Sequence, residues 1–317
     1  MAAKNKPNEI YLTRVYDAPV KTVWEVFNDP SQVAQWWGPR GFTLTTHSKD
    51  FKPGGHWAYT MHGPDGKNWE NKTIYHVIEK YSRLVYDHGG NDDRPPLFRV
   101  TVDFIEEKGG KTKLDFTMAL ATEEVAKETK KFIKAAGGNS TWDRLAEYLD
   151  KQTKNKDVFV INRSFETDMN TMFKMWTEPN HFSKWLAPAG FNMEFIRTEI
   201  KEGGKSFYKM SNDQGFTMYG TLSYKEITSP NRLVYTQQFA DEKENVSRHP
   251  GAPTWPETML ATVTFNEEGP KQTRVTIEWE AIGKYTAEEL AAFIKERGGM
   301  TQGWTGSFDK LEDYLKK

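Results

Sequence analysis

The sequence predicts an α+β fold of two tandem domains, each a curved six- to seven-stranded antiparallel sheet wrapped on a long C-terminal helix. One observation is an internal repeat: Trp-Trp-Gly-Pro at residues 36–39 returns as Trp-Leu-Ala-Pro at residues 185–188, 149 positions later. The same offset joins Leu-Val-Tyr at residues 84–86 to Leu-Val-Tyr at residues 233–235. The other observation is the order of hydrophobic patterns, which predicts one strand, two helices, six strands and a last helix in each copy (β-α-α-β6-α). A duplication of this length predicts that each copy folds as its own unit.

The domain boundaries follow from the chain length and from a polar linker. At 317 residues the chain has room for two domains of ordinary size. Residues 151–156 are polar and separate the end of the first copy from the start of the second. We therefore predict helix-and-sheet domains at residues 8–150 and 157–317. We expect a monomer that holds an intramolecular pair resembling what single-domain relatives could form by dimerising.

Alternation and helical spacing define the elements of the first copy in turn. Residues 8–16 alternate and are rich in β-branched and aromatic types, which predicts a strand. Apolar residues at positions 20, 23, 24 and 27 have the spacing of a buried helical stripe, and Pro30 begins a second short helix. A helix over residues 122–149 is expected to bury its apolar stripe on the concave face of the sheet. Six strands joined by tight turns predict an antiparallel meander at residues 42–51, 57–61, 69–79, 83–88, 97–106 and 111–120.

The second copy repeats this order with two differences. The offset between the copies grows by twelve residues in the stretch 240–255, which contains two prolines and predicts an enlarged loop over one end of the sheet. Residues 300–306 are expected to lengthen a break in the last helix that begins at Gly298-Gly299, the counterpart of Gly137-Gly138.

Composition excludes several classes of function. The net charge of −1 lacks the basic footprint of a nucleic-acid-binding protein. No apolar run approaches the ~20 residues that span a bilayer, and the first residues carry no apolar segment of a secretion signal. The chain has no cysteine, so it has no disulfide and no thiolate chemistry, and a cytoplasmic location is expected. An aromatic content of 14% is compatible with large rings that enclose a space.

A set of motifs recurs in order along the chain, at residues 17–19 (Asp-Ala-Pro), 23–24, 36–39, 50–55, 61–66, 83–86, 145–149, 303–304 (Gly-Trp) and 311–315. With these motifs, both copies resemble the START-like helix-grip (SRPBCC) superfamily, and in particular the C-terminal domain of the heat-shock-protein-90 ATPase activator. The resemblance covers nearly the whole chain, twice. It implies a helix-grip fold, in a family whose members include ligand carriers, cyclases, resistance proteins and co-chaperone modules. The first copy lacks the Gly-Trp, so the two cavities are not expected to be equivalent.

A cavity between the sheet and the last helix is the candidate binding site in each domain, because adaptable apolar sites are typically lined by aromatic and methionine side chains. The alternative is that the same residues form a solid core. In the first domain, strand alternation places at the cavity Trp57, Tyr59, Met61, Phe98, Phe116 and Met118, with Phe132 from the helix. In the second domain, the corresponding set is Tyr208, Met210, Met218, Tyr235, Met259, Ile277, Trp279, Phe293 and Trp304.

Other chemistry-bearing residues form no motif. The histidines lack the spacing of a metal site, so we predict no metal and no cofactor. One interpretation is general acid–base catalysis by His88 or Glu70 at the mouth of a cavity. The alternative is that the histidines are surface residues or make separate hydrogen bonds. Arg14 and Arg163 occupy the same point of the first strand in each copy, where either a structural salt bridge or an acidic ligand would suit them.

We expect each domain to bind a small hydrophobic or aromatic molecule without covalent chemistry, with no catalytic residue, no nucleic acid and no membrane as partner. One alternative is a co-chaperone-like module that contacts a heat-shock chaperone through its surface. Another is a cyclase, dehydratase or hydrolase that uses the same cavity.

Overall fold

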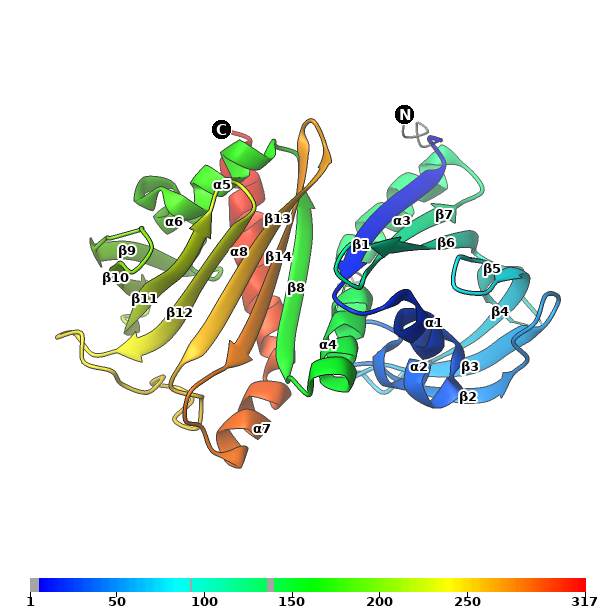
Figure 1. Ribbon diagram of the computed structural model, residues 1–317, viewed down its shortest axis with the longest axis horizontal. Helices are drawn as coiled ribbons and strands as arrows, with labels where there is room; N and C mark the ends of the chain where they lie inside the picture. The colour runs from blue at the N-terminus through cyan, green and yellow to red at the C-terminus, as the bar shows by residue number, and fades with distance from the viewer. Residues whose placement is uncertain (1–5, 92, 136–139) are drawn as a thin grey trace. The chain divides into compact units, whose positions relative to one another are not determined.

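The chain divides into two compact units, Met1–Asn155 and Lys156–Lys317, here called unit 1 and unit 2 (Figure 1). The computed structural model describes residues 6–91, 93–135 and 140–317. Each unit contains a seven-stranded antiparallel sheet, ordered β1-β7-β6-β5-β4-β3-β2 in unit 1 and β8-β14-β13-β12-β11-β10-β9 in unit 2. The predicted α+β fold of two tandem domains is therefore confirmed.

The two units share one order of elements. Unit 1 consists of β1 (Glu9–Tyr16), α1 (Val20–Asn28), α2 (Pro30–Trp36), β2 (Thr43–Lys49), β3 (His56–His62), β4 (Asn68–Glu79), β5 (Arg83–Gly90), β6 (Phe98–Glu107), β7 (Lys111–Ala119), α3 (Glu123–Ala135) and α4 (Ser140–Lys154). Unit 2 consists of β8 (Val158–Phe165), α5 (Met169–Thr177), α6 (Pro179–Trp185), β9 (Phe191–Arg197), β10 (Lys205–Asn212), β11 (Thr217–Thr228), β12 (Arg232–Ala240), β13 (Met259–Gly269), β14 (Gln272–Ala281), α7 (Ala287–Lys295) and α8 (Arg297–Leu315).

Six consecutive strands of each sheet form a meander of hairpins. The first strand of each unit lies at the edge of the sheet and pairs with the last strand of the meander. In unit 1, β1 runs antiparallel to β7 with Leu12 opposite Phe116. In unit 2, β8 pairs with β14 in the same way, and Ile161 lies opposite Ile277. The C-terminal helix of unit 2, α8, runs along one face of its sheet (Figure 1). Its apolar side chains are buried there.

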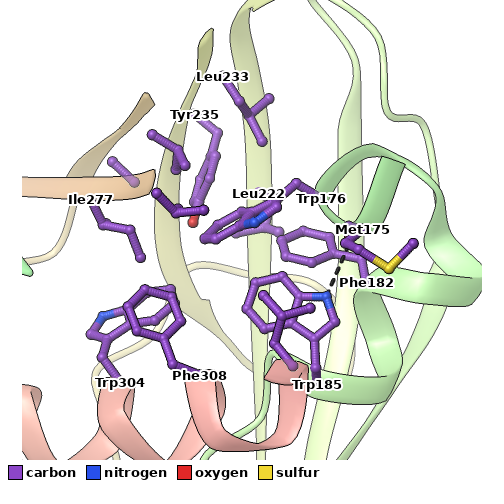
Figure 2. Packing of buried hydrophobic residues seen from close by; sticks show 14 of the residues in the cluster. Met175, Trp176, Phe182, Trp185, Leu222, Leu233, Tyr235, Ile277, Trp304 and Phe308 are labelled. Carbon is purple, nitrogen blue, oxygen red and sulfur yellow. Dashed lines mark hydrogen bonds between the residues drawn. The ribbon is translucent and has the colours of Figure 1, made fainter. Parts of the chain in front are cut away.

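The first tryptophan of the repeated motif fixes the pair of short helices in both units. Trp36 and Trp185 are completely buried. Each indole N–H donates to a backbone carbonyl of the preceding helix, Trp36 to Val26 at 3.2 Å and Trp185 to Met175 at 2.9 Å (Figure 2). A buried indole needs such an acceptor, and this one ties α1 to α2 and α5 to α6.

A cation from the last helix holds the loop that follows the motif. In unit 1, the Arg144 guanidinium donates to the carbonyls of residues 37, 38 and 39 at 3.3, 2.9 and 3.0 Å. In unit 2, the Lys310 ammonium donates to the carbonyls of Ala187 and Phe191 at 2.9 and 3.0 Å. Burial lowers the pKa of Arg144 to about 10 and lowers that of Lys310. The last helix is thus bonded to the motif as well as packed on the sheet.

The arginine of each first strand forms a salt bridge with the last helix. Arg14 lies 3.5 Å from Asp143 in a buried pair. Arg163 lies 2.6 Å from Asp309, whose side chain is 53% exposed. The structural interpretation of both arginines is therefore confirmed.

The expected long break in the last helix of unit 2 is wrong. α7 ends at Lys295 and α8 already begins at Arg297, so residues 300–306 are helical. The side chains of this stretch explain the result, since Trp304 is buried and its turn must therefore lie against the sheet. The counterpart break in unit 1, Gly137-Gly138, lies outside the described residues. Among the described helices, none combines the length and the apolar character required to cross a bilayer.

Candidate functional site

Unit 2 contains a cavity of about 690 Å³ between its sheet and its two C-terminal helices. Volumes of this size are typical of sites for drug-sized ligands. Strands β10, β11, β12 and β14, the loop before β13, the α6–β9 connection and helices α7 and α8 all contribute to its wall. The lining residues are Leu186, Pro188, Tyr208, Met210, Met218, Leu222, Tyr235, Gln237, Phe239, His249, Gly251, Ala252, Pro253, Thr254, Trp255, Trp279, Ala292, Lys295, Glu296, Gly299, Met300, Gly303, Trp304 and Ser307.

The loop between β12 and β13 covers one end of the cavity. It spans residues 241–258, whereas its counterpart in unit 1 spans residues 91–97. Arg248 attaches the loop to α7, because its guanidinium lies 2.7 Å from the Glu289 carboxylate and donates to the Trp255 carbonyl at 2.8 Å. The Trp255 ring then meets Phe293 edge-on at 5.7 Å. The predicted enlarged loop is therefore present, and two contacts hold it against the helix.

Aromatic rings line the cavity from both the helices and the sheet. Trp304 extends from α8 toward the strands, and the Tyr235 hydroxyl of β12 is directed toward α8 (Figure 2). The Trp304 ring lies 6.1 Å from Trp176, nearly parallel to it, and 5.9 Å from Trp279, perpendicular to it. Rings fixed at right angles present both faces and edges to a bound molecule.

The floor of the cavity carries one hydrogen-bonded polar pair. The Gln237 amide donates from Nε2 to the Tyr208 hydroxyl oxygen at 3.0 Å. Gly220 faces this hydroxyl, and any Cβ at that position would collide with it. Burial raises the pKa of Tyr208 to about 12, so the hydroxyl keeps its proton at neutral pH.

The covering loop adds a histidine to this polar set. His249 accepts the backbone N–H of Gly251 at Nδ1, at 3.0 Å. Burial lowers the pKa of His249, so the ring is neutral at neutral pH and carries its proton on Nε2.

In unit 1, the positions equivalent to this cavity carry larger rings. The repeat pairs Trp37 with Leu186 and Trp57 with Ser206 at the offset of 149 residues. The Trp57 ring stacks on Tyr59 at 4.1 Å, and the Trp37 ring meets Trp57 at 5.4 Å. From α4, the Trp142 ring lies 4.1 Å from Phe116 on β7. These rings all belong to, or pack against, the hydrophobic core of unit 1.

His88 lies within this group of rings at the position equivalent to Gln237. Its Nδ1 is 3.4 Å from the Tyr59 hydroxyl oxygen, which also accepts the indole N–H of Trp37 at 3.3 Å. The imidazole stacks on Phe98 at 5.0 Å. Burial lowers the pKa of His88 to about 4, so this histidine is neutral at physiological pH.

Six of the nine predicted site residues of unit 2 line the cavity: Tyr208, Met210, Met218, Tyr235, Trp279 and Trp304. The other three, Met259, Ile277 and Phe293, are fully buried in the core. Strand alternation did not reveal the loop residues from His249 to Trp255 or the glycines of α8. The inserted, proline-containing stretch was the available signal for the loop.

The seven predicted site residues of unit 1 fall into two groups. Trp57, Tyr59 and Phe116 are buried, and Met61, Phe98 and Met118 are partly buried. Phe132 differs from the expectation, because on α3 it is 71% exposed and its ring does not reach the core. The rings of α4 that pack against the core include Trp142 and Tyr148.

In the described part of the chain, no arrangement of side chains supports the acid–base hypothesis or the metal hypothesis. Glu70 is exposed on β4, whereas His88 is enclosed by rings. Among the described residues, no three His, Cys, Asp or Glu side chains gather as a metal site would require.

Each unit is a sheet closed over its own C-terminal helices, which is the helix-grip arrangement. Residues 17–150 and 166–316 each match the family described as activator of Hsp90 ATPase homolog 1-like protein. The chain belongs to this family, with two copies of the domain. The search among curated proteins found no match.

The chain is similar to several solved structures. A protein from Mycobacterium smegmatis is 18% identical, with 51% of this chain and 91% of that chain covered and a TM-score of 0.43. A protein from Arthrobacter aurescens is 24% identical, with 47% and 92% covered and a TM-score of 0.42. The di-domain ARO/CYC BexL from the BE-7585A biosynthetic pathway is 10% identical, with 96% and 97% covered and a TM-score of 0.37.

Proposed function

We propose that unit 2 binds a small apolar or aromatic molecule non-covalently in the cavity between its sheet and α8. The cavity of about 690 Å³ carries this proposal. A space of this size lined by Met210, Met218 and Met300 would be unusual in a close-packed core, and methionines adapt their shape to a ligand. The covering loop, held by Arg248 and Trp255, would exclude water from the bound molecule.

A titration with the neutral dye N-phenyl-1-naphthylamine tests the proposal. We expect the dye fluorescence to rise in a saturable manner with one site per chain. The melting temperature of unit 2 should rise with dye concentration, because a ligand that binds only the folded state stabilises it. Hydrogen exchange should slow in residues 249–255 and 297–307, which border the cavity. Exchange that is unchanged in these segments at saturating dye would refute the assignment.

The family description supports a second candidate, contact with a heat-shock chaperone. This function would use the surface of the units and would not need the cavity. The ATPase rate of a purified Hsp90-type chaperone, measured with and without the full chain, tests it. Stimulation that persists when the cavity is filled with dye would favour this candidate over ligand binding.

A further inference from the structure

Two side chains that line the cavity of unit 2, Tyr208 and His249, each carry a hydrogen-bond donor. The Tyr208 hydroxyl oxygen already accepts from Gln237, so the Tyr208 proton remains to be donated. The neutral His249 ring accepts a backbone N–H at Nδ1, so its second nitrogen is also a donor.

The cavity wall offers little charge to a ligand. Lys295 and Glu296, on adjoining positions at the end of α7, are exposed, and the other lining residues are uncharged at neutral pH. A charged ligand would lose its hydration without gaining a buried counter-charge, which is costly. The bound molecule is therefore expected to be neutral.

The geometry points to a carbonyl ligand: we infer that unit 2 binds a neutral aromatic molecule whose carbonyl oxygen accepts a hydrogen bond from the Tyr208 hydroxyl. This inference rests on the proposed function and specifies its ligand. The perpendicular rings of Trp279 and Trp304 suit an aromatic body. A carbonyl oxygen has two lone pairs and no proton of its own, so it can accept from the donors of Tyr208 and His249.

Gly220 shows that the position of the Tyr208 hydroxyl is specific to unit 2. The ring of Tyr208 lies over this glycine, and a Cβ there would collide with the hydroxyl. The equivalent pair in unit 1 is Tyr59 opposite Asn71. There the Tyr59 hydroxyl lies 3.4 Å from Nδ1 of His88, a ring nitrogen that can accept its proton within unit 1.

Two probes of matched shape test the inference: fluorene, a neutral aromatic hydrocarbon, and 9-fluorenone, which adds one carbonyl oxygen. On the full wild-type chain, displacement of N-phenyl-1-naphthylamine should give a Kd for 9-fluorenone about tenfold lower than that for fluorene. In the Tyr208→Phe variant, this preference should fall to about twofold or less, with the affinity for fluorene unchanged. Tyr59→Phe, the equivalent change in unit 1, should leave the preference intact.

The outcomes separate the inference from the proposed function. Equal affinities of the wild-type chain for the two probes would overturn the carbonyl inference and leave the cavity as a purely apolar site. A preference that survives Tyr208→Phe would overturn the inference as well. Failure of both probes and of the dye to bind the wild-type chain would overturn the proposed function itself. Retained fluorene binding by Tyr208→Phe shows that the variant is folded.

Discussion

In unit 1 the second tryptophan of the repeated motif, Trp37, lies within a group of rings, whereas its counterpart in unit 2, Leu186, lines a cavity. The framework around both positions is the same. Trp36 and Trp185 tie together the short helices, and a cation of the last helix holds the next loop. The difference teaches that duplication preserved the contacts that close the sheet on its helix while the interior changed.

The interior changed through few substitutions and one insertion. Trp57 is replaced by Ser206, and His88 by Gln237, each removing a ring that packs in unit 1. A loop of residues 241–258 then covers the end of the sheet in unit 2. Leu186 and Gln237, which replace rings of unit 1, and residues of this loop all line the cavity of unit 2.

The largest expected difference concerns the salt bridge between the first strand and the last helix. Asp143→Ala should lower the free energy of unfolding of unit 1 by about 3–5 kcal/mol, because it leaves the Arg14 guanidinium buried without this carboxylate. The equivalent change in unit 2, Asp309→Ala, should cost less than about 1 kcal/mol, because that carboxylate is half exposed. Hydrogen exchange at increasing urea concentrations, followed in peptides of each unit, measures both. Equal losses would contradict the comparison.

The second expected difference is the pH dependence of stability that His88 gives to unit 1. Because the folded-state pKa of His88 is lowered from 6.5 to about 4, the unfolded chain binds a proton at this residue before the folded chain does. This contribution to stability is complete above pH 6.5 and is lost as the pH falls toward 4, by about 3 kcal/mol.

The variant His88→Gln, which copies Gln237, isolates the contribution of His88. Between pH 6.5 and 4, the free energy of unfolding of unit 1 should change less with pH in this variant than in the wild-type chain. Urea unfolding at a series of pH values, followed by hydrogen exchange in unit 1, measures the change. Identical pH profiles for the two proteins would show that His88 is not held neutral by its surroundings.

The smallest expected effect concerns the loop that only unit 2 possesses. Arg248→Ala removes the ion pair with Glu289. This pair is partly exposed, so it contributes little energy to holding the loop on α7. We expect N-phenyl-1-naphthylamine to dissociate about three- to fivefold faster in stopped-flow measurements. Arg232→Ala, which removes an exposed pair with Glu226 on the sheet, is the matched control. A dissociation rate that is raised equally in both variants would refute a specific role for the loop.

The sequence was sufficient to predict the fold because its signals are local and duplicated. The alternation of apolar and polar residues predicted the strand positions to within a few residues, for example β4, predicted at residues 69–79 and found at Asn68–Glu79. The internal repeat then predicted the same order of elements in unit 2. The prediction of a long helix break in unit 2 was wrong. The glycines near residues 300–306 suggested an interruption, but this stretch is helical and its Trp304 is buried.

The candidate site was less predictable, since alternation shows which face of a strand a side chain occupies but not how deeply it lies. Ile277 and Trp279 occupy the same face of β14, yet the first is buried in the core and the second lines the cavity. Phe132 fits a helical stripe but is exposed, because an apolar position on a helix does not by itself specify what the helix packs against. The loop residue His249 has no counterpart in the other copy, so the repeat could not identify it.

The most direct test of ligand binding in unit 2 is to fill its cavity with the ring that unit 1 carries. In Leu186→Trp, the affinity for N-phenyl-1-naphthylamine should fall by about tenfold or more, because the indole occupies the space of the ligand. Ile196→Trp, which adds the same ring at an exposed position of β9, should bind the dye as the wild-type chain does. Undiminished dye binding by a folded Leu186→Trp chain would contradict the claim that this cavity is the binding site.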